Sequence, residues 1–193
     1  MQAGKSSIQF EHPPIITSAA SIVGQTEGEG PLASFFDRVE PDPTFGKKSW
    51  EEAESELQRQ TVQKCLDKAG RQAADVNCLF AGDLLGQIVA TSFGVESFDI
   101  PFFGLYGACS TMGEAMILGA MAAGAGYADR VLALASSHFA SAERQFRFPL
   151  AYGNQRPQST TWTVTGCGCV MIEENEKNEG KDGRRAKENA SES

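Results

Sequence analysis

Apolar runs alternate with amphipathic stretches along this chain, and the alternation predicts buried strands separated by helices. Strands are predicted over five segments rich in β-branched or small apolar residues: Ile15 to Val23, Asp75 to Phe80, Ile100 to Tyr106, Arg130 to Ser136 and Thr160 to Ile172. Strands that are apolar on both faces and joined by helices are typical of parallel sheets. The pattern therefore indicates an α/β fold with a parallel sheet.

Three helices are predicted between these strands. The first begins after Ser49, whose hydroxyl and the acidic residues that follow are typical of a capped start, and it ends at Gly70. The second, Met112 to Ala125, consists almost wholly of Ala, Gly, Met, Ile and Leu, so it is predicted to be buried inside the protein. A short helix is predicted over Gln87 to Phe93, and Gly24 to Asp42 is predicted to be a loop.

Composition divides the chain after residue 172. Residues 1–172 contain the predicted strands and helices and are expected to form one domain. From Glu173 to Ser193 almost every residue is polar or charged. Because such a segment buries too little apolar surface to offset the entropy of ordering, a disordered polar tail is expected over residues 173–193.

Composition and charge narrow the function classes. The net charge is -8 and no basic patch or arm stands out, which argues against nucleic-acid binding. No apolar run reaches the roughly 20 residues that span a bilayer, so no transmembrane segment is predicted. The first residues are polar, unlike a secretory leader, and the five scattered cysteines predict no disulfide framework. These features indicate a reducing, cytoplasmic compartment.

The candidate chemistry centres on Cys109. This residue lies in Gly107-Ala-Cys-Ser-Thr111, where a predicted strand turns into the apolar helix. The first amides of a helix lack partners within it and carry partial positive charge, so they favour a thiolate and attract anions. Cys109 is therefore interpreted as a nucleophile or as part of an anion-binding cradle, and the alternative is a small buried apolar residue.

Other polar residues fall just past predicted strand ends, where the active sites of parallel sheets lie. Asp83 is either a turn or helix-cap residue or a hydrogen-bond acceptor in a pocket. Ser136, Ser137 and His138 follow another buried strand. His138 is either a hydrogen-bonded structural residue or a partner of Cys109.

Two further motifs carry candidate chemistry. Arg144 and Arg147 lie among aromatic residues and either clamp a carboxylate or pair with Glu143 in a structural ion pair. Cys167-Gly-Cys169 lacks the four-ligand spacing of a zinc site, so we predict two small side chains in a crowded strand and no metal.

Nine short motifs occur in order between residues 8 and 172. They are Phe10-Glu-His-Pro13, Gly30-Pro-Leu32, Lys48-Ser-Trp-Glu51, Ala81-Gly-Asp-Leu-Leu85, Phe103-Gly-Leu-Tyr-Gly-Ala-Cys-Ser-Thr111, Ser136-Ser-His138, Ala142-Glu-Arg-Gln-Phe-Arg-Phe-Pro149, Tyr152-Gly153 and Thr163-Val-Thr-Gly166. Together they resemble the stage V sporulation protein AD family, and the long arginine-containing string is a specific part of that resemblance.

The resemblance implies a thiolase-like fold, related to condensing enzymes that join acyl groups, with Cys109 in the place of their nucleophile. The chain resembles only the first of the two similar α/β halves of that fold, and the second half is missing from this sequence. Because those enzymes take catalytic partners from the second half, no enzymatic activity is expected. The alternative is an acyltransferase that uses Cys109. The uncovered apolar face of a half-fold predicts poor solubility or association, for example as a homo-dimer.

The resemblance also implies a sporulation protein that binds dipicolinic acid, alone or as its calcium chelate, and supports its uptake into the developing spore. The expected partners are the membrane components of the same uptake system. The expected location is the cytoplasmic side of the forespore, peripherally associated with the inner spore membrane. No cofactor is expected.

Dipicolinate is a flat pyridine ring with two carboxylates. A site for it needs helix-end amides, hydroxyls and cations near the carboxylates, and flat apolar surface for the ring. The expected ligand-binding residues are Asp83, Cys109, Ser110, Ser136, Ser137, His138, Arg144 and Arg147. Thr111 adds to the helix end, and Phe103, Tyr106 or Phe139 is expected to cover the ring.

Overall fold

A computed structural model describes residues 2–84, 86–146, 159 and 163–175. The strands are β1 (Gln2–Ala3), β2 (Ser7–Ile8), β3 (Ile15–Gly24), β4 (Arg38–Glu40), β5 (Cys78–Asp83), β6 (Phe102–Gly104), β7 (Arg130–Ser137) and β8 (Gly166–Glu173). The α-helices are α1 (Gln25–Gly28), α2 (Trp50–Ala69), α3 (Val89–Val95), α4 (Thr111–Gly124) and α5 (Phe139–Phe146). Short 3-10 helices cover Ala33–Phe35, Ala73–Asp75, Glu96–Phe98 and Ala108–Ser110.

One six-stranded sheet organises the chain, in the order β4-β3-β8-β7-β5-β6. Strands β3 and β4 are parallel, as are β7, β5 and β6, whereas β8 pairs antiparallel with both β3 and β7. All these strands except β8 therefore run in one direction and end at one edge of the sheet. We call it the carboxyl-end edge, and β8 begins there.

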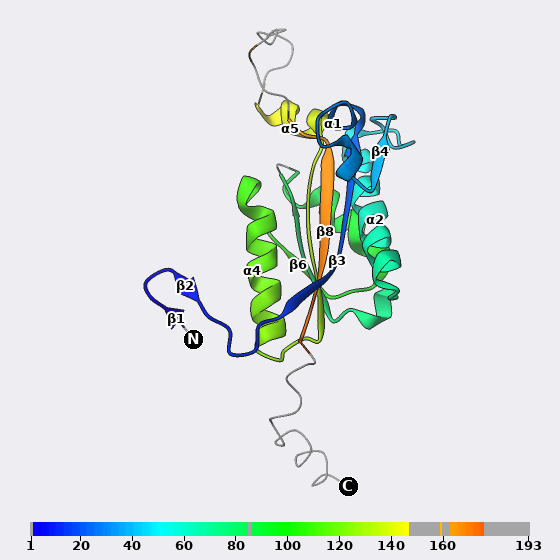
Figure 1. Cartoon of the computed structure of the whole chain (residues 1–193). Coiled ribbons are helices and arrows are strands. Elements are labelled where there is room, and N and C mark those ends of the chain that lie inside the picture. Colours follow the sequence, from blue (N-terminus) through cyan, green and yellow to red (C-terminus); the bar gives the residue numbers. More distant parts are fainter. Residues whose placement is uncertain (1, 85, 147–158, 160–162, 176–193) are drawn as a thin grey trace.

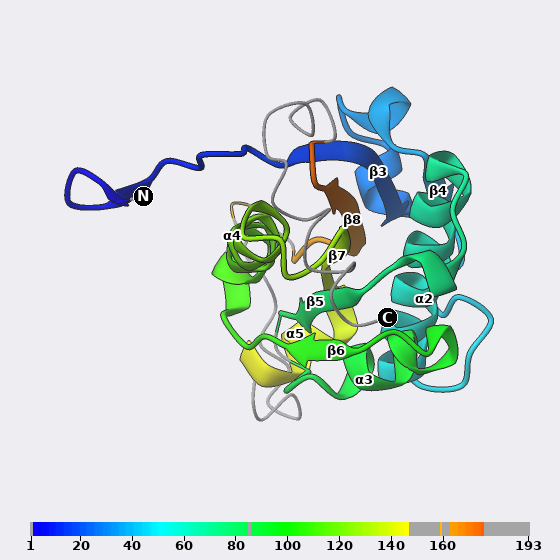
Figure 2. The same cartoon turned by 90° about the horizontal axis from the view of Figure 1, so that it is seen from below.

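Helices cover both faces of the sheet, which makes three layers (Figure 1). Helix α2 packs on one face, with α3 beside it, and α4 packs on the other, as the view along the sheet also shows (Figure 2). Alternate strand residues serve the two faces: Leu132 and Leu134 of β7 join the α2 core, and Ala133 between them joins the α4 core. The sheet core is thus buried on both sides. The β1–β2 hairpin projects away from the sheet in both views.

Helix α2 begins after Ser49 and ends at Gly70, as predicted from the sequence. The Ser49 hydroxyl accepts a hydrogen bond from the Glu52 amide at 3.2 Å, and the Glu52 carboxylate accepts from the Ser49 amide, so the capping box is complete. Gly70 ends the helix in the left-handed conformation at φ 64°. The apolar stripe of α2 packs on the sheet and includes Leu57 and Cys65, which are both fully buried.

The predicted parallel sheet is wrong in one strand. Between the end of β7 and the start of β8 the chain forms α5, which lies at the carboxyl-end edge. A parallel neighbour needs a connection that crosses the sheet back to the opposite edge. Because the described part of this connection stays at the edge where β7 ends, β8 begins there and runs antiparallel, and the sheet is mixed.

Several predicted boundaries also differ. Residues 24–42 contain α1, a 3-10 turn and the edge strand β4, where a loop was expected. Strand β5 begins at Cys78 and extends to Asp83, β6 has only three residues, and α3 begins two residues later than expected, at Val89. At the C-terminal end, β8 continues through Glu173, which accepts from Arg130 Nε at 2.9 Å. The expected disordered tail lies mostly outside the described residues.

Helix α4 was expected to be buried inside the protein, and in this chain only one of its faces is. Thr111, Ala115, Gly119 and Ala123 are buried against the sheet. Ile117 on the opposite face is 57% exposed. The apolar sequence alone does not say how many neighbours cover the helix.

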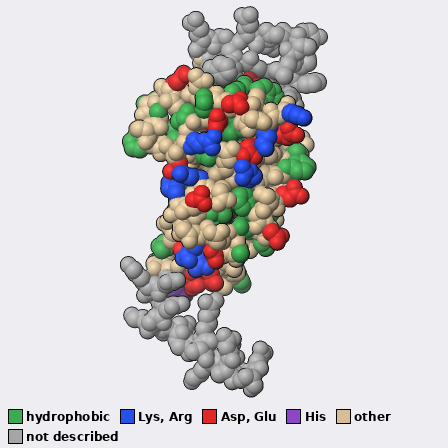
Figure 3. Space-filling view, turned by 90° about the vertical axis from the view of Figure 1, so that its right-hand side faces the viewer, with side chains coloured by type: hydrophobic (Ala, Val, Ile, Leu, Met, Phe, Trp, Pro, Cys, Tyr) green, Lys and Arg blue, Asp and Glu red, His purple; other side chains and the backbone are tan. Residues whose placement is uncertain are grey.

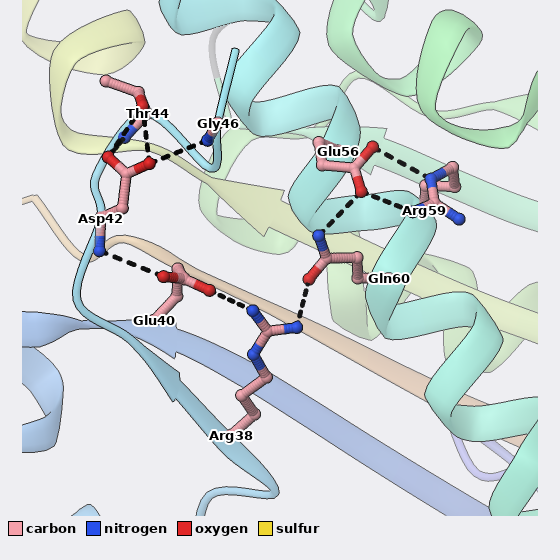
Figure 4. A network of polar contacts seen from close by, with 8 residues as sticks. All are labelled: Arg38, Glu40, Asp42, Thr44, Gly46, Glu56, Arg59 and Gln60. Carbon is pink, nitrogen blue, oxygen red and sulfur yellow. Dashed lines mark hydrogen bonds and ion pairs between the residues drawn. The ribbon is translucent and has the colours of Figure 1, made fainter.

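A polar network fastens the loop after β4 to α2 (Figure 4). The Arg38 guanidinium donates to Gln60 Oε1 at 2.7 Å, and the Asp42 carboxylate accepts from the Gly46 amide at 2.9 Å. The loop so held carries Pro43, whose carbonyl oxygen faces the carboxyl-end edge and accepts from His138 there.

Candidate functional site

The Cys109 turn lies at the carboxyl-end edge, as predicted, and its thiol is exposed. The Leu105 amide after β6 donates to the Ala81 carbonyl of β5 at 2.8 Å. Gly82 permits this approach, because a Cβ there would lie 2.1 Å from the Leu105 carbonyl oxygen. Ala108 has φ 48°, a left-handed conformation that is costly for a residue other than glycine and is often found at functional sites.

The first turn of α4 follows directly. Ser110 Oγ donates to the Gly107 carbonyl at 2.7 Å and makes no side-chain cap to the helix. The exposed Glu114, however, bends back: a Cβ on Gly107 would lie 2.8 Å from Glu114 Oε2. An anion at this helix start would therefore compete with a carboxylate of the chain itself. Glu114 was not predicted as a site residue, although acidic residues in the first turn of a helix commonly interact with the helix dipole.

Asp83 is fully buried and acts as a cap for α3. Its carboxylate accepts from the Ile88 amide at 3.2 Å, the Thr91 amide at 3.2 Å and the Thr91 hydroxyl at 2.7 Å. The helix-cap alternative describes this geometry. Ile88 itself has φ 66°, which is strained for a β-branched side chain.

His138 is fully buried and its ring is held on every side. Its Nδ1 accepts from the Ala140 amide at 3.2 Å, so Nε2 carries the hydrogen and donates to the Pro43 carbonyl at 2.8 Å. Trp50 and Phe139 lie against its faces, with ring centroids 5.4 and 5.0 Å away. Burial lowers the pKa of His138, so the ring is neutral at pH 7. This is the structural alternative, and it leaves neither nitrogen free for a thiol.

The two serines before His138 have different environments. Ser136 is buried, and its hydroxyl donates to Glu54 Oε1 at 2.8 Å and accepts from Gln58 Nε2 at 2.6 Å. Ser137 is half-buried, and its hydroxyl donates to the Val164 carbonyl oxygen, just before β8. Of the two, only Ser137 presents its side chain at the surface of the carboxyl-end edge.

Glu54 is the main residue that the sequence analysis missed. It is 1% exposed, and its second oxygen accepts from Ser141 Oγ of α5 at 2.7 Å. Burial raises its pKa to about 7, and the hydrogen bonds from Ser141 and Ser136 only partly oppose this. The signal was present in the sequence: Glu54 and Gln58 lie one position after Ala53 and Leu57 on the buried stripe of α2.

The arginines remain predictions. Arg144 lies in α5, at the carboxyl-end edge, and its side chain is outside the described part of the structure, as is all of Arg147. Among the aromatic residues expected to cover a ring, Phe103 stacks on Phe80 at 5.0 Å between centroids and is 53% exposed. Phe139 packs against the His138 ring instead.

A pocket of about 270 Å³ opens at the same edge, beside the start of β8. It is lined by Gly24, Gln25, Thr26, Glu27, Pro41, Pro43, Phe139, Thr163 and Thr165. Its walls thus combine threonine hydroxyl groups with the Phe139 ring, two prolines and the carboxylate of Glu27. A larger groove of about 710 Å³ lies on the outer side of α2 and contains none of the predicted site residues. On that side acidic and basic side chains are interspersed (Figure 3), so it offers no surface of a single charge.

Cys167 and Cys169 are buried side by side on one face of β8, toward Cys65 of α2. Burial raises the pKa of the Cys167 thiol, which favours the protonated, non-ligating form. Within the described residues no group of three or more His, Cys, Asp or Glu side chains is arranged to hold a metal ion. Nor does any described helix have the length and apolar character needed to cross a bilayer.

Solved structures with a similar fold include 3-oxoacyl-(acyl carrier protein) synthases III and OleA. A 3-oxoacyl-(acyl carrier protein) synthase III from Xanthomonas oryzae pv. oryzae superposes with a TM-score of 0.57 at 14% identity, over 88% of this chain and 58% of that chain. A variant of OleA from Xanthomonas campestris gives 0.59 at 13% identity, over 89% and 61%. At such identities the likeness shows the fold alone: one half of a thiolase-like α/β fold.

Sequence relatives are closer. The family model described as Stage V sporulation protein AD matches residues 4–182. Stage V sporulation protein AD from Bacillus subtilis (strain 168) is 43% identical over 169 residues, which are 88% of this chain and 50% of that protein. The chain thus spans about half the length of this relative. Because the family model covers most of the chain, this protein belongs to the Stage V sporulation protein AD family.

Proposed function

We propose that this chain binds dipicolinate, alone or as its calcium chelate, at the carboxyl-end edge, and supports uptake of this ligand into the developing spore. The observation that carries the proposal is the exposed Cys109 bend at the same edge as Ser137 and the arginine-bearing helix α5. Backbone amides at the start of α4 suit one carboxylate, which would have to displace Glu114 there, and the guanidinium of Arg144 suits the other. The exposed rings of Phe103 and Tyr106 offer flat apolar surface nearby in the chain.

Calorimetry with dipicolinate, with and without calcium, tests the proposal. We expect Cys109→Ser to retain binding, because the site uses the backbone around this residue and not its thiol. Arg144→Ala is expected to weaken binding about tenfold or more, since a charge-assisted hydrogen bond contributes about 1.5–3 kcal/mol. Arg59→Ala on the outer side of α2 is the matched control. Absence of binding by the unaltered chain contradicts the proposal, and an unchanged affinity in Arg144→Ala removes that residue from the site.

Acyl transfer by Cys109 is the second candidate. The exposed thiol and the strained Ala108 before it favour this candidate, as does the fold shared with synthases. Against it, His138 has both nitrogens engaged, so within the described residues it offers no free base to the thiol. Intact-mass analysis after incubation with an acyl thioester distinguishes the candidates: an acyl adduct absent from Cys109→Ser identifies an enzyme.

The cellular setting is part of the proposal. We place the chain at the cytoplasmic side of the forespore, peripherally associated with the inner spore membrane through the membrane components of the uptake system. Fractionation of sporulating cells tests this. The chain should sediment with membranes only when those components are present, and high salt should release it from the membranes.

A further inference from the structure

A buried network joins two carboxylates just beneath the carboxyl-end edge. The Gln58 amide nitrogen donates one hydrogen to Ser136 Oγ at 2.6 Å and the other to Thr91 Oγ1 at 3.0 Å. The Ser136 hydroxyl donates a hydrogen bond to Glu54 Oε1 at 2.8 Å, and the Thr91 hydroxyl donates one to Asp83 Oδ2 at 2.7 Å. Every donor in the network therefore points toward a carboxylate, which is the arrangement expected when both carboxylates are ionised.

Glu54 and Asp83 are two buried carboxylates that interact electrostatically. None of the ion pairs among the described residues involves Glu54 or Asp83. Asp83 is among the groups that raise the pKa of Glu54, in addition to its burial. A dicarboxylate bound at the edge above would add two further negative charges. One proton taken up by the network would relieve this repulsion.

Glu54 is better placed than Asp83 to take that proton. Two of the three donors to Asp83 are backbone amides, which cannot become acceptors for a protonated carboxyl group. Both donors to Glu54 are hydroxyls, which can turn. Ser141 Oγ lies 2.7 Å from Glu54 Oε2 and 3.0 Å from the His138 carbonyl oxygen. A protonated Glu54 can therefore donate to Ser141 while the Ser141 hydroxyl donates to that carbonyl.

The network also holds an unused acceptor. Gln58 Oε1 is buried and has no hydrogen-bond partner in the part of the chain that the structure describes. His138 does not compete for the proton, because protonation of its Nδ1 would break the bond from the Ala140 amide. An extra hydrogen is thus more easily accepted around Glu54 than at the histidine.

Several other titratable or charged groups lie on α2 and on the elements that pack against it, among them Cys78 on β5 and Cys169 on β8. Glu51 lies on α2 itself, Asp83 at the end of β5 and Cys167 on β8, and all three interact electrostatically with Glu54. Helix α5 carries Glu143 and Arg144, β7 begins with Arg130 and is followed by His138, and β8 ends at Glu173. Helix α3 and strand β3 contribute no titratable side chain.

We propose that binding of an aromatic dicarboxylate at the carboxyl-end edge is coupled to uptake of a proton from solvent by the Glu54 carboxylate. The proton bonds to Oε2, the Ser141 hydroxyl turns to the His138 carbonyl, and no other bond is made or broken. Glu54 is a positioning and charge-compensating residue that does not touch the ligand. The inference depends on the proposed function.

Titration calorimetry with pyridine-2,6-dicarboxylate at pH 7.5, in HEPES and in Tris, tests the coupling. The two buffers differ in ionisation enthalpy, so the difference in apparent enthalpy gives the protons taken up. We expect uptake of roughly half a proton per bound anion by the unaltered chain. Glu54→Gln should bind with no uptake, and the control Asp67→Asn, near the other end of the same helix, should keep it.

Equal enthalpies in the two buffers would overturn the coupling and leave the proposed function standing, as would unchanged uptake in Glu54→Gln. No binding by the unaltered chain would overturn both. Because Glu54→Gln replaces a core residue, a second measurement uses the unaltered chain. Carbon NMR of labelled glutamate side chains should show one carboxyl that titrates near neutral pH. Its titration midpoint should move to higher pH when the ligand is added, and an unchanged midpoint would refute the proposal.

Discussion

At the scale of single residues, we expect Glu54 to make the stability of this chain fall as the pH rises through neutrality. Its pKa is raised from the ordinary 4.5 to about 7 by burial, so the folded state binds a proton more tightly than the unfolded state. The favourable contribution is complete below pH 4.5 and is lost as the pH rises through 7. Between pH 6 and 8 the free energy of unfolding should fall by about 1.4 kcal/mol from this group.

Urea unfolding of the unaltered chain and of Glu54→Gln, followed at pH 6, 7 and 8, measures this effect. The fall should disappear in Glu54→Gln, because glutamine does not titrate. Asp67→Asn serves as the control, since Asp67 is exposed near the other end of the same helix and should leave the slope unchanged. A slope that persists in Glu54→Gln would show that another group is responsible.

At the scale of elements, the close approach of β5 to the turn after β6 places Cys109. A Cβ at residue 82 would lie 2.1 Å from the Leu105 carbonyl oxygen and 2.8 Å from Thr111 Cγ2, so neither neighbour accommodates it without moving. Gly82→Ala should lower the free energy of unfolding by about 2 kcal/mol or more. It should also change the rate at which iodoacetamide labels Cys109.

Gly113 provides the matched control for that substitution. It lies in the first turns of α4, and a Cβ there would meet nothing within 4 Å. Gly113→Ala should therefore raise stability by up to about 1 kcal/mol through helix propensity. Thermal unfolding of both variants separates the steric effect from the general effect of removing a glycine, and equal changes in the two would contradict the close approach.

The same scale shows which elements can be predicted from local sequence. Both ends of α2 follow from Ser49 and Gly70, because caps act over one helical turn. Strand β4 escaped prediction, since three residues carry too weak a pattern and β3 beside it supplies the pairing. Strand β6 is short because only three of its residues pair with β5. The apolar run from Ile100 to Tyr106 does not show how many of its residues will find a partner strand.

At the scale of the whole molecule, one face of α4 is uncovered. Ile117 and Met121 are 57% and 37% exposed on this face, the other face of α4 being packed on the sheet. Contiguous apolar surface of this kind favours association. We expect the chain to self-associate, and Ile117→Gln combined with Met121→Gln to weaken the association about tenfold or more.

Sedimentation velocity over a range of concentrations measures this. Val89→Gln is the control, because Val89 is 47% exposed but lies on α3, beyond the opposite face of the sheet. Loss of association in the control with no effect of the α4 changes would place the contact elsewhere. The helical circular dichroism of all variants should remain unchanged.

The sequence by itself determined the α/β class, the long helices with their ends, and the bend that carries Cys109, because these depend on residues adjacent in the chain. Only the tertiary structure decided the direction of β8, the burial of His138, the capping role of Asp83 and the contact of Glu54 with Ser136. The last pair is 82 positions apart. Such contacts arise when the sheet and α2 pack together, and no local pattern encodes which buried polar groups will then meet.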